Sequence, residues 1–394
     1  LALIRCLKNI LIYINGYSVL KIIFVVNDLN YFISHRMPIG LSLIEKGFDV
    51  SVIAPDECPL TLSGAGFKYY SVKMSRKGMN PLAELSTIFA LHRLFKKIQP
   101  DLVHLVTIKP YLYGGIAARS AKVPSVVSAV AGLGTLFSVQ GLKNKVIKSI
   151  LYPMYRFAFG HNNQAVIFQN TNDRDLLVNW GVLQFKKSRL IRGAGVDLSV
   201  YPYLPEPDGL PIISFAARLL KDKGVIEFVE ASRILKARGI EARFWLIGDP
   251  DPGNSNTVTR EQLDLWQAAG LVECLGYRTD IADLFSQSNI VSLPSYYGEG
   301  LPKVLIEAAA SGRAVVTTDH PGCRDAIEPD TGVLVSIKDS TALADAIERL
   351  IKSPDLRKSM GLAGRKLAEA EFSIETVVNR HLEIYGELTL KDDK

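Results

Sequence analysis

The stretch from residue 290 to residue 307, IVSLPSYYGEGLPKVLIE, contains the unit on which the fold prediction rests. Its first four residues, Ile-Val-Ser-Leu, are mostly apolar, which is typical of a strand that is buried on both faces. A loop with Gly298 and Gly300 follows, and a helical pattern begins at Pro302, where a missing N–H costs little. This order predicts a βα unit of a parallel sheet.

The same alternation runs through the chain on both sides of this unit. In the first half, strands are expected at 21–26, 49–54, 102–107, 126–128 and 165–169, and helices at 33–46, 82–97 and 112–121. In the second half, strands are expected at 212–216, 242–248, 272–275, 290–293 and 314–318, and helices at 224–238, 260–269, 280–287, 302–311 and 340–351. The pattern predicts an α/β protein with two Rossmann-like, doubly wound parallel-sheet domains that face each other across a cleft.

Composition shifts suggest the limits of these domains. The first domain is expected at 21–200, a proline-rich linker at 201–211, and the second domain at 212–372. Residues 373–394 are expected to form a C-terminal helix that packs back on the first domain. The fold is expected to begin near Leu20, with residues 1–20 as an extension, since the chain starts with Leu rather than Met.

Composition excludes several protein classes. The 394 residues are 48% hydrophobic and 22% charged, which argues against a disordered or fibrous protein. No apolar run reaches the roughly 18 residues that a membrane-spanning helix needs. The four cysteines lie far apart without a C-x-x-C pair, so a disulfide scaffold or a zinc site is not expected. A reducing, cytoplasmic location fits this cysteine usage.

Charge is divided unevenly along the chain. Residues 1–185 contain 20 Lys and Arg against 9 Asp and Glu, a net charge of +11, whereas residues 186–394 contain 26 against 31, a net charge of −5. Residues 102–172 contain no acidic residue at all. This asymmetry predicts an anionic partner for the first half, such as a phospholipid, a nucleic acid or a phosphorylated substrate, with a solvated basic face as the plain alternative.

Two clusters in the second half have the chemistry of a diphosphate site. Arg218 and Lys223 flank a strand-to-helix turn at the carboxyl edge of the predicted sheet, where ligands collect, and both cations suit a diphosphate. Glu299 precedes the helix that begins at Pro302, and Glu307 lies more than one turn inside it. The helix start offers unpaired amides to a phosphate. The alternative interpretation is surface charge for Arg218 and Lys223. For Glu299 it is complementarity to the helix dipole, and for Glu307 it is a solvated helix face.

Together these motifs resemble glycosyltransferase family 4, whose members are retaining enzymes of the GT-B fold that use nucleotide-sugar donors. The resemblance covers about residues 21–388 and rests on Arg218, Lys223-Gly224 and the E-x7-E segment from Glu299 to Glu307. Residues 27–36, 131–134 and 321–325 look most similar to bacterial enzymes that add hexosamines to polyprenyl-diphosphate-linked glycans.

The resemblance implies a role for each matching residue. Arg218 and Lys223 would hold the donor diphosphate, Glu307 the ribose hydroxyls and Glu299 the hydroxyls of the transferred sugar, with Glu299, Arg218 and Lys223 counted as catalytic. The amides of Gly300 and Leu301, just before Pro302, would approach the sugar or phosphate. Tyr277 and Arg278 would lie beside the nucleotide base of the donor. No cofactor and no metal are expected. Asp249-Pro250-Asp251 is a D-x-D sequence, and in metal-dependent transferases such a pair of aspartates chelates a divalent ion that bridges the diphosphate. Here Arg218 and Lys223 already supply the positive charge that the diphosphate needs.

In the first half, the candidates for the acceptor or a phosphate are His35, Arg36, Lys109, Gly132 and Gly134. Many family members carry a histidine where this chain has Val130-Ala131-Gly132. His35 and His104 are possible substitutes, although His104 fits a buried core position equally well.

A basic amphipathic helix is expected within 141–160. Its apolar residues recur at helical spacing, and Lys143, Lys145 and Lys148 lie on the other side. Such a helix is typical of an anionic membrane surface, and an ordinary packed helix is the alternative. Nucleic acid is not expected, because no aromatic and basic stacking platform occurs.

The expected function is transfer of a hexosamine, GalNAc or GlcNAc, from a UDP-sugar to a lipid-diphosphate-linked acceptor at the inner face of the cell membrane, with the anomeric configuration retained. Transfer of another hexosyl group, from UDP-Gal, UDP-Glc or GDP-Man, remains an alternative. A sugar-nucleotide epimerase and a non-catalytic nucleotide-sugar-binding subunit also remain open.

Overall fold

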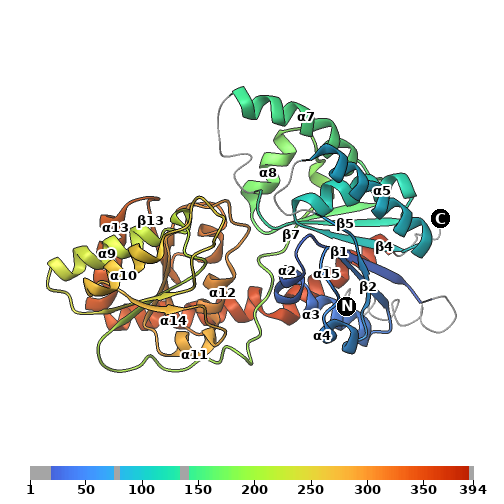
Figure 1. The fold of residues 1–394 in the computed structure, drawn as a ribbon. Helices are drawn as coiled ribbons and strands as arrows, with labels where there is room; N and C mark the ends of the chain where they lie inside the picture. The colour runs from blue at the N-terminus through green and yellow to red at the C-terminus, as the bar shows by residue number, and fades with distance from the viewer. Residues whose placement is uncertain (1–18, 75–79, 134–141, 390–394) are drawn as a thin grey trace. The chain divides into compact units, whose positions relative to one another are not determined.

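The computed structural model describes residues 19–74, 80–133 and 142–389. Contacts divide the chain into two compact units, of which unit 1 contains residues up to Ile191 together with Val377–Lys394, and unit 2 contains Arg192–Thr376 (Figure 1). Residues 1–20, expected as an extension, lie outside the described residues except for the last two. Each unit contains one parallel sheet, so the predicted α/β class is confirmed.

Unit 1 is built on a seven-stranded sheet with the order β3-β2-β1-β4-β5-β6-β7. The strands are β1 (Lys21–Val25), β2 (Asp49–Ala54), β3 (Lys68–Ser71), β4 (Leu102–Val106), β5 (Ser125–Val130), β6 (Gln164–Phe168) and β7 (Ser188–Leu190). All pairings are parallel, and β4, β5 and β6 are buried along their whole length. The central strands are therefore covered on both faces, as their largely apolar sequences require.

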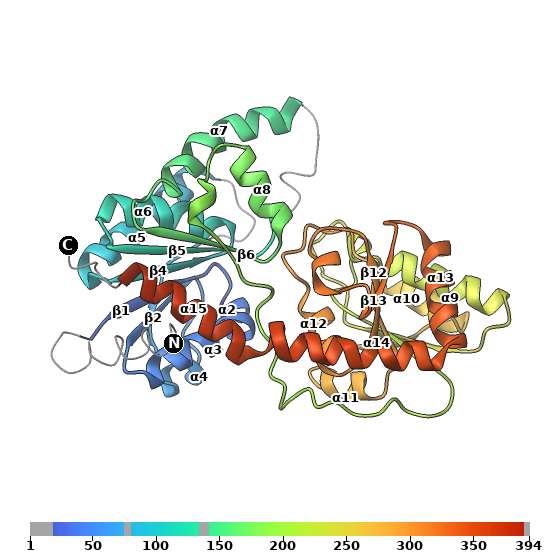
Figure 2. The ribbon, with the colours of Figure 1, turned by 180° about the vertical axis from the view of Figure 1, so that it is seen from behind.

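Helices cover both faces of this sheet (Figures 1 and 2). One face carries α2 (Leu29–His35), α3 (Met37–Glu45), α4 (Leu60–Gly64) and α15 (Ile374–Thr389). The other carries α5 (Pro81–Ile98), the π-helical turn Pro110–Gly114, α6 (Gly115–Ala121), α7 (Leu142–Ala158) and α8 (Thr171–Asn179). The Ser125 hydroxyl and the Asn163 amide donate to the Leu388 carbonyl at 3.0 and 2.8 Å, which fixes α15 to unit 1.

The single helix expected over residues 33–46 is two helices. α2 ends at His35 and α3 begins at Met37, with Arg36 between them at φ −129° and ψ −18°. Pro38 has no N–H to donate to the Ser34 carbonyl, and its ring would clash with that carbonyl in a continuous helix. The break turns α3 onto β2, and its buried residues Ile39 and Leu43 face the core.

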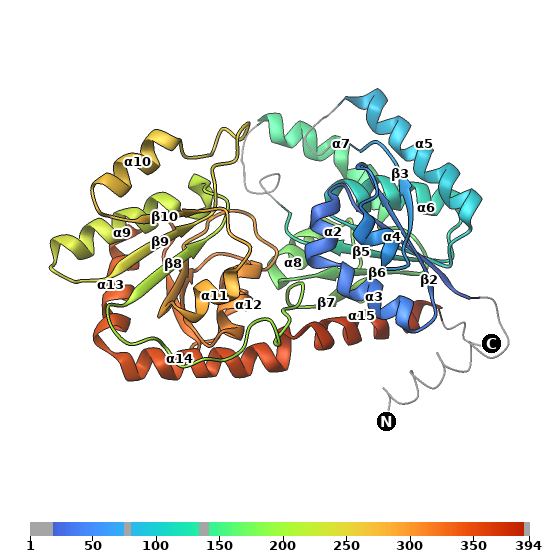
Figure 3. The same ribbon diagram turned by 60° about the horizontal axis from the view of Figure 1, so that its bottom comes forward.

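Unit 2 is built on a six-stranded parallel sheet with the order β10-β9-β8-β11-β12-β13 (Figure 3). The strands are β8 (Ile212–Ala216), β9 (Arg243–Ile247), β10 (Glu273–Gly276), β11 (Ile290–Leu293), β12 (Ala314–Thr318) and β13 (Gly332–Val335). The helices are α9 (Val225–Ala237), α10 (Arg260–Ala268), α11 (Ile281–Ser286), α12 (Lys303–Ala310), α13 (Ser340–Lys352) and α14 (Pro354–Leu367). Within this layer structure α9 packs with α13, and α12 packs with α14.

The boundary between the units differs from the expected one. The chain enters unit 2 at Arg192, and the stretch 201–211, expected as a linker, is held on that unit. Glu206 forms an ion pair of 2.8 Å with Arg357, and both side chains are almost fully buried. The Arg313 guanidinium donates to the Leu204 carbonyl at 2.9 Å. The prolines of this stretch thus keep an extended chain on a surface that supplies its polar partners, instead of marking a free connection.

Candidate active site

The candidate site in unit 2 begins at the turn that follows β8. Lys221–Lys223 form one turn of 3-10 helix, and Gly224 follows with φ +83°. A Cβ atom at Gly224 would lie 2.2 Å from the Pro294 carbonyl oxygen. Only glycine permits this close approach with this backbone. The turn that bears Lys223 is thereby held against the end of β11, where the loop to α12 begins.

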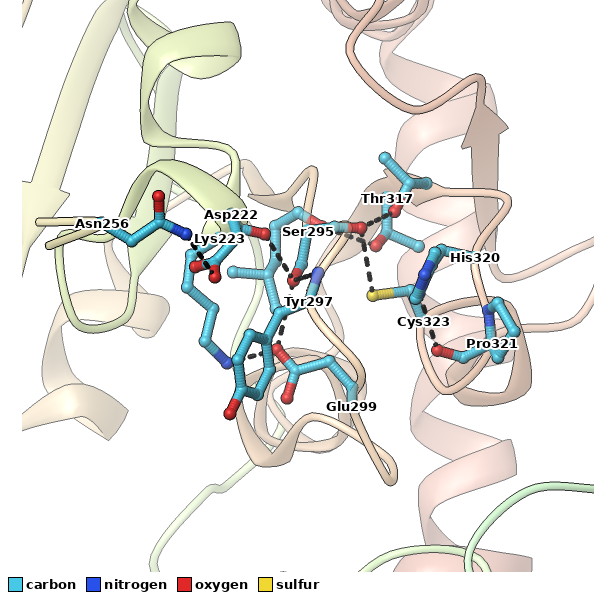
Figure 4. A network of polar contacts seen from close by, with 12 residues as sticks. Asp222, Lys223, Asn256, Ser295, Tyr297, Glu299, Thr317, His320, Pro321 and Cys323 are labelled. Atoms are coloured by element: carbon cyan, nitrogen blue, oxygen red, sulfur yellow. Dashed lines mark hydrogen bonds and ion pairs between the residues drawn. The ribbon is translucent and has the colours of Figure 1, made fainter. Parts of the chain in front are cut away.

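Lys223 and Glu299 form an ion pair at this contact (Figure 4). Both side chains are largely buried, with 14% and 11% of their surfaces exposed. The Ser295 hydroxyl lies 3.2 Å from Glu299 Oε1, and the Lys223 ammonium lies 5.0 Å from the centre of the Tyr297 ring. The structure thus joins two residues that are 76 positions apart in the sequence and that were both predicted as site residues.

A second loop supports the backbone of Glu299. Gly322 has φ +84°, and a Cβ atom there would lie 2.7 Å from the carbonyl oxygens of both Glu299 and Gly300. The Asp325 carboxylate accepts a hydrogen bond of 2.9 Å from the Gly322 amide. Cys323 is buried beside them, and burial, aided by the Glu299 charge, raises the pKa of its thiol to about 12. The thiol is therefore neutral, and the loop acts as a support for Glu299.

The start of α12 lies next in the chain. The helix begins at Lys303, one residue later than expected, with Pro302 as its N-cap residue. Gly300, Leu301 and Pro302 are all buried. No acidic side chain lies in the first turn of the helix. The positive end of the helix dipole is therefore not neutralised from within the helix.

Glu307, inside α12, is only 8% exposed. Its carboxylate lies 3.4 Å from the Lys303 ammonium and is hydrogen-bonded to Tyr201. Burial raises the pKa of Glu307, while the Lys303 charge and the Tyr201 hydrogen bond act in the opposite direction. A largely buried carboxylate that already accepts one hydroxyl group has the chemistry needed to bind the hydroxyls of a sugar.

Arg218 follows β8, and it is paired with one aspartate of the D-x-D sequence. Its Nη1 atom lies 2.7 Å from Asp251 Oδ2, and nearly half of the side chain is exposed. Asp249 is paired with Arg260 at 3.0 Å. Among the described residues, no group of three or more Asp, Glu, His or Cys side chains is arranged to hold a metal ion. Each aspartate of the D-x-D sequence, Asp249 and Asp251, is thus paired with an arginine.

Tyr277 and Arg278, which were expected to lie beside the nucleotide base of the donor, follow β10. Tyr277 is 75% exposed. Arg278 is held in an ion pair with Asp280, in which Nε lies 2.7 Å from Oδ1. Both residues belong to the same connection at the carboxyl edge of the sheet of unit 2, which is the edge where Lys223 and Glu299 also lie.

Several residues that no sequence motif identified complete the network. Asp222 accepts a hydrogen bond of 2.7 Å from the Asn256 amide, and its carbonyl lies 3.2 Å from the Ser295 hydroxyl. Thr318 donates to the Ser295 carbonyl. Ser295 itself opens the S-Y-Y-G-E-G segment, and its position at a strand end was the one signal available. Tyr201 was assigned to the linker, and nothing in its sequence context pointed to Glu307.

The candidates of unit 1 divide between its carboxyl edge and its interior. His35 is half-buried, stacks on Tyr31 with ring centres 4.1 Å apart, and lies 2.7 Å from the Ser34 hydroxyl. Lys109 forms an ion pair with Glu84 of α5, so a carboxylate from outside the acid-free run balances this cation. Gly132 has φ +102°, whereas Gly134 lies outside the described residues.

Arg36 and His104 are buried in unit 1, with 2% and 0% of their surfaces exposed. His104 shares a hydrogen bond with Tyr385 of α15 and stacks on His381, with ring centres 5.7 Å apart. Burial lowers the pKa of His104, and the charges of His381 and Arg36 lower it further. His104 is therefore a core residue. Arg36 is buried close enough to His104 and His381 for its charge to lower the pKa of both, and its contact with a phosphate stays a prediction.

A strained residue marks the carboxyl edge of the sheet of unit 1. Thr107 follows β4 with φ +74°, a conformation that is rare for a β-branched residue. Its hydroxyl donates to the Asn27 side-chain oxygen at 2.7 Å, and Asn27 follows β1. Backbone strain of this kind costs about 1–3 kcal/mol and clusters at functional sites.

Comparison with known proteins gives the same result for both halves of the chain. A family model described as Glycosyl transferase 4-like matches residues 21–170, and one described as Glycosyl transferases group 1 matches residues 203–367.

Two curated relatives and one solved structure are similar over most of their length. The chain is 31% identical over 366 residues to the N,N'-diacetylbacillosaminyl-diphospho-undecaprenol alpha-1,3-N-acetylgalactosaminyltransferase of Campylobacter jejuni, covering 89% of this chain and 94% of the relative. It is 26% identical over 323 residues to the UDP-Gal:alpha-D-GlcNAc-diphosphoundecaprenol alpha-1,3-galactosyltransferase of Escherichia coli, covering 78% and 81%. The structure of Anabaena HepE in complex with UDP and glucose superposes with a TM-score of 0.75 at 17% identity, covering 93% of this chain and 99% of that one. The chain therefore is a glycosyltransferase of the GT-B fold and belongs to the group 1, family 4-like glycosyltransferases.

Proposed function

We propose that this glycosyltransferase transfers an N-acetylhexosamine, GalNAc or GlcNAc, from a UDP-sugar to a polyprenyl-diphosphate-linked glycan, with the anomeric configuration retained. The support is the similarity to the C. jejuni N-acetylgalactosaminyltransferase, which extends over nearly the whole of both chains. The E. coli relative, whose name specifies UDP-Gal, makes transfer of galactose to the same class of acceptor the second candidate.

The single observation that carries this proposal is the ion pair between Lys223 and Glu299 beside the start of α12. Cleavage of the anomeric C–O bond places negative charge on the departing diphosphate and positive charge on the sugar ring. A cation, a row of backbone amides and a carboxylate in one place match both charges. Preorganised donors of this kind contribute roughly 3–4 kcal/mol each at the transition state.

In the proposed reaction the bond from the anomeric carbon to the β-phosphate oxygen breaks, and a bond to the acceptor hydroxyl forms on the same face of the sugar. The proton of that hydroxyl passes to the oxygen of the leaving phosphate. Glu299 orients the sugar hydroxyls, because its carboxylate is already held by Lys223 and Ser295. Arg218 and Lys223 together balance the negative charge of the diphosphate. Glu307 accepts hydrogen bonds from the ribose hydroxyls.

We further propose that the reaction needs no divalent metal. Arg218 and Lys223 place two fixed cations after β8, and both aspartates of the D-x-D sequence are held by arginines. A diphosphate that binds here meets positive charge from side chains and from a helix start, which is the role that Mg²⁺ plays in other transferases.

Unit 1 is assigned the acceptor and peripheral contact with the inner face of the membrane. None of the helices in the described parts of the chain is long and apolar enough to cross a bilayer. The expected basic helix is present as α7, and Ile150 on it is 62% exposed, whereas Leu151 and Met154 pack against the core. Lys148 is half-buried, and the side chains of Lys143 and Lys145 lie outside the described part. The second half of α7 is thus a packed helix, and the membrane proposal concerns its first half.

The test is incubation with a panel of UDP- and GDP-sugars and a polyprenyl-diphosphate-linked disaccharide, followed by mass analysis of the lipid. We expect a mass increase of one N-acetylhexosamine with a UDP donor. A product that forms with a GDP-sugar and with no UDP-sugar would contradict the proposal. A product that forms only with UDP-Gal would favour the second candidate, and release of an epimerised donor without acceptor would show an epimerase.

A further inference from the structure

Unit 1 has a second candidate site at the other end of its sheet. A pocket of ≈ 680 Å³ lies between the end of α6, the second half of α7 and the loops that precede β6 and β7. These segments lie at the amino-terminal ends of the strands. Asn27, Thr107 and Gly132, by contrast, follow the carboxyl ends of their strands. The pocket is therefore separate from the edge that we assign to the acceptor.

Four cations line this pocket, and no acidic side chain lies among the described residues of its lining. They are Arg119, Arg156, Lys186 and Lys187. In the part of the chain that the structure describes, none of them is within ion-pair distance of a carboxylate. By comparison, Lys109 in the same half of the chain has a carboxylate partner. The pocket thus concentrates positive charge that the protein itself does not neutralise.

Three of these cations are held by backbone carbonyl groups. Arg119 donates to the Phe157 carbonyl at 3.0 Å, Arg156 to the Gly181 carbonyl at 3.3 Å, and Lys187 to the His161 carbonyl at 2.6 Å. Such bonds fix the position of a cation and leave its charge in place. Lys186, the fourth cation of the lining, is exposed. Arg119, Arg156 and Lys187 are thus held in place by the protein itself.

The cations also affect one another. Burial lowers the pKa of Lys187, and the charges of Lys186 and Arg119 lower it further. Gly160 permits this crowding, because a Cβ atom there would lie 2.6 Å from Arg119 Nη1. A multiply charged anion would relieve the repulsion, and arginine and lysine together are well suited to the oxygens of a phosphate. The volume is in the range of small-molecule sites and exceeds what a single phosphate fills.

We propose that this pocket binds a ligand through one or more negatively charged phosphate groups. Two sources share this chemistry, a soluble diphosphate and the headgroup of an anionic phospholipid. The lining contains apolar surface, since Phe157 is 42% exposed. Phe185, which precedes Lys186 in the sequence, is 60% exposed. The proposal is independent of the transferase reaction, because it concerns the opposite edge of the sheet in unit 1.

The experiment measures binding of inorganic pyrophosphate by calorimetry, and co-sedimentation with vesicles of phosphatidylcholine with and without one third phosphatidylglycerol. The variant is Lys186→Ala, and the matched control is Lys358→Ala, an exposed lysine of α14 in unit 2. We expect Lys186→Ala to weaken binding about fivefold, and Lys186→Ala with Arg156→Gln to weaken it roughly 30-fold, whereas Lys358→Ala has no effect. Melting temperatures establish that the variants are folded.

The arms separate the sources. Binding of pyrophosphate that depends on Lys186 supports a soluble ligand, and binding only to anionic vesicles that depends on Lys186 supports a lipid headgroup. Pyrophosphate that binds the wild type but is lost in Lys223→Ala and kept in Lys186→Ala binds at the donor site, and this result overturns the proposal. Absence of binding in both arms overturns it as well.

Discussion

Replacing Lys223 by alanine tests the chemical core of the proposed reaction. The Lys223 side chain is only 14% exposed and is paired with Glu299, whose side chain is 11% exposed. At a separation of about 4 Å and an effective dielectric constant near 20, a unit charge on the leaving diphosphate gains about 4 kcal/mol from such a cation. This agrees with the roughly 3–4 kcal/mol that one preorganised donor contributes at a transition state. We therefore expect Lys223→Ala to lower kcat by roughly 10²–10³.

The control for this experiment comes from the same turn. Lys221 lies two positions earlier and is exposed. Lys221→Ala removes the same charge from the same turn without touching Glu299, so its kcat should stay within about twofold of the wild type. Lys223→Arg keeps the charge but changes its position, and an intermediate rate is expected.

The assay follows transfer of a radiolabelled sugar from the UDP donor to the lipid-linked acceptor at saturating concentrations of both. Circular dichroism and thermal melting show whether each variant is folded. A folded Lys223→Ala enzyme with near wild-type kcat would refute the assignment of Lys223 to the leaving diphosphate. Equal losses in Lys221→Ala and Lys223→Ala would show that the general field of the turn matters, and not the pair with Glu299.

Three further outcomes are expected. Gly224→Ala should destabilise the protein by about 2 kcal/mol or more, measured by urea unfolding, because the added Cβ would meet the Pro294 carbonyl. The control is Gly239→Ala, where φ is +71° but no atom lies near the added Cβ, so only the backbone strain of about 1–2 kcal/mol is expected. Equal losses of stability in the two variants would refute the steric argument. EDTA should leave the rate of sugar transfer unchanged, and a loss restored by Mg²⁺ would contradict metal independence. Burial lowers the pKa of His381 to about 3 and also lowers that of His104, while the unfolded chain takes up these protons near pH 6.5. The free energy of unfolding should therefore fall by up to about 1.4 kcal/mol per pH unit for each histidine as the pH decreases from 6.5 toward 3. His381→Gln should make the dependence of the unfolding free energy on pH less steep. An unchanged slope would contradict the buried neutral state of His381.

Edge strands show where the sequence pattern was insufficient for the fold. The central strands β8, β11 and β12 were predicted with the limits that the structure has, because strands buried on both faces consist mostly of apolar and β-branched residues. β3, β7 and β13 were not predicted. All three lie at the edges of their sheets and are only partly buried. The sequences of β3 and β7 carry polar residues like those of loops. β13 has the apolar sequence Gly-Val-Leu-Val, but it is only four residues long and begins with glycine.

The candidate site shows a similar division. Lys223, Glu299 and Glu307 could be proposed from the sequence, because each lies in a local strand–turn–helix motif with its own chemistry. Ser295 and Tyr201 could not, because their roles depend on a partner that is distant along the chain or on a side-chain direction. The charge pattern misled in one respect, since Lys109 was counted in an acid-free run and is balanced by Glu84.

The sequence alone determined the alternation of strands and helices, the two parallel sheets and the presence of cations and carboxylates at strand ends. Hydrophobic periodicity and glycine or proline at turns are local properties, and they act before the chain has folded. Only the tertiary structure decided that Lys223 meets Glu299, that Arg36 is buried, and that residues 201–211 are held on unit 2. These facts depend on which distant segments come into contact, and packing of the whole chain sets those contacts.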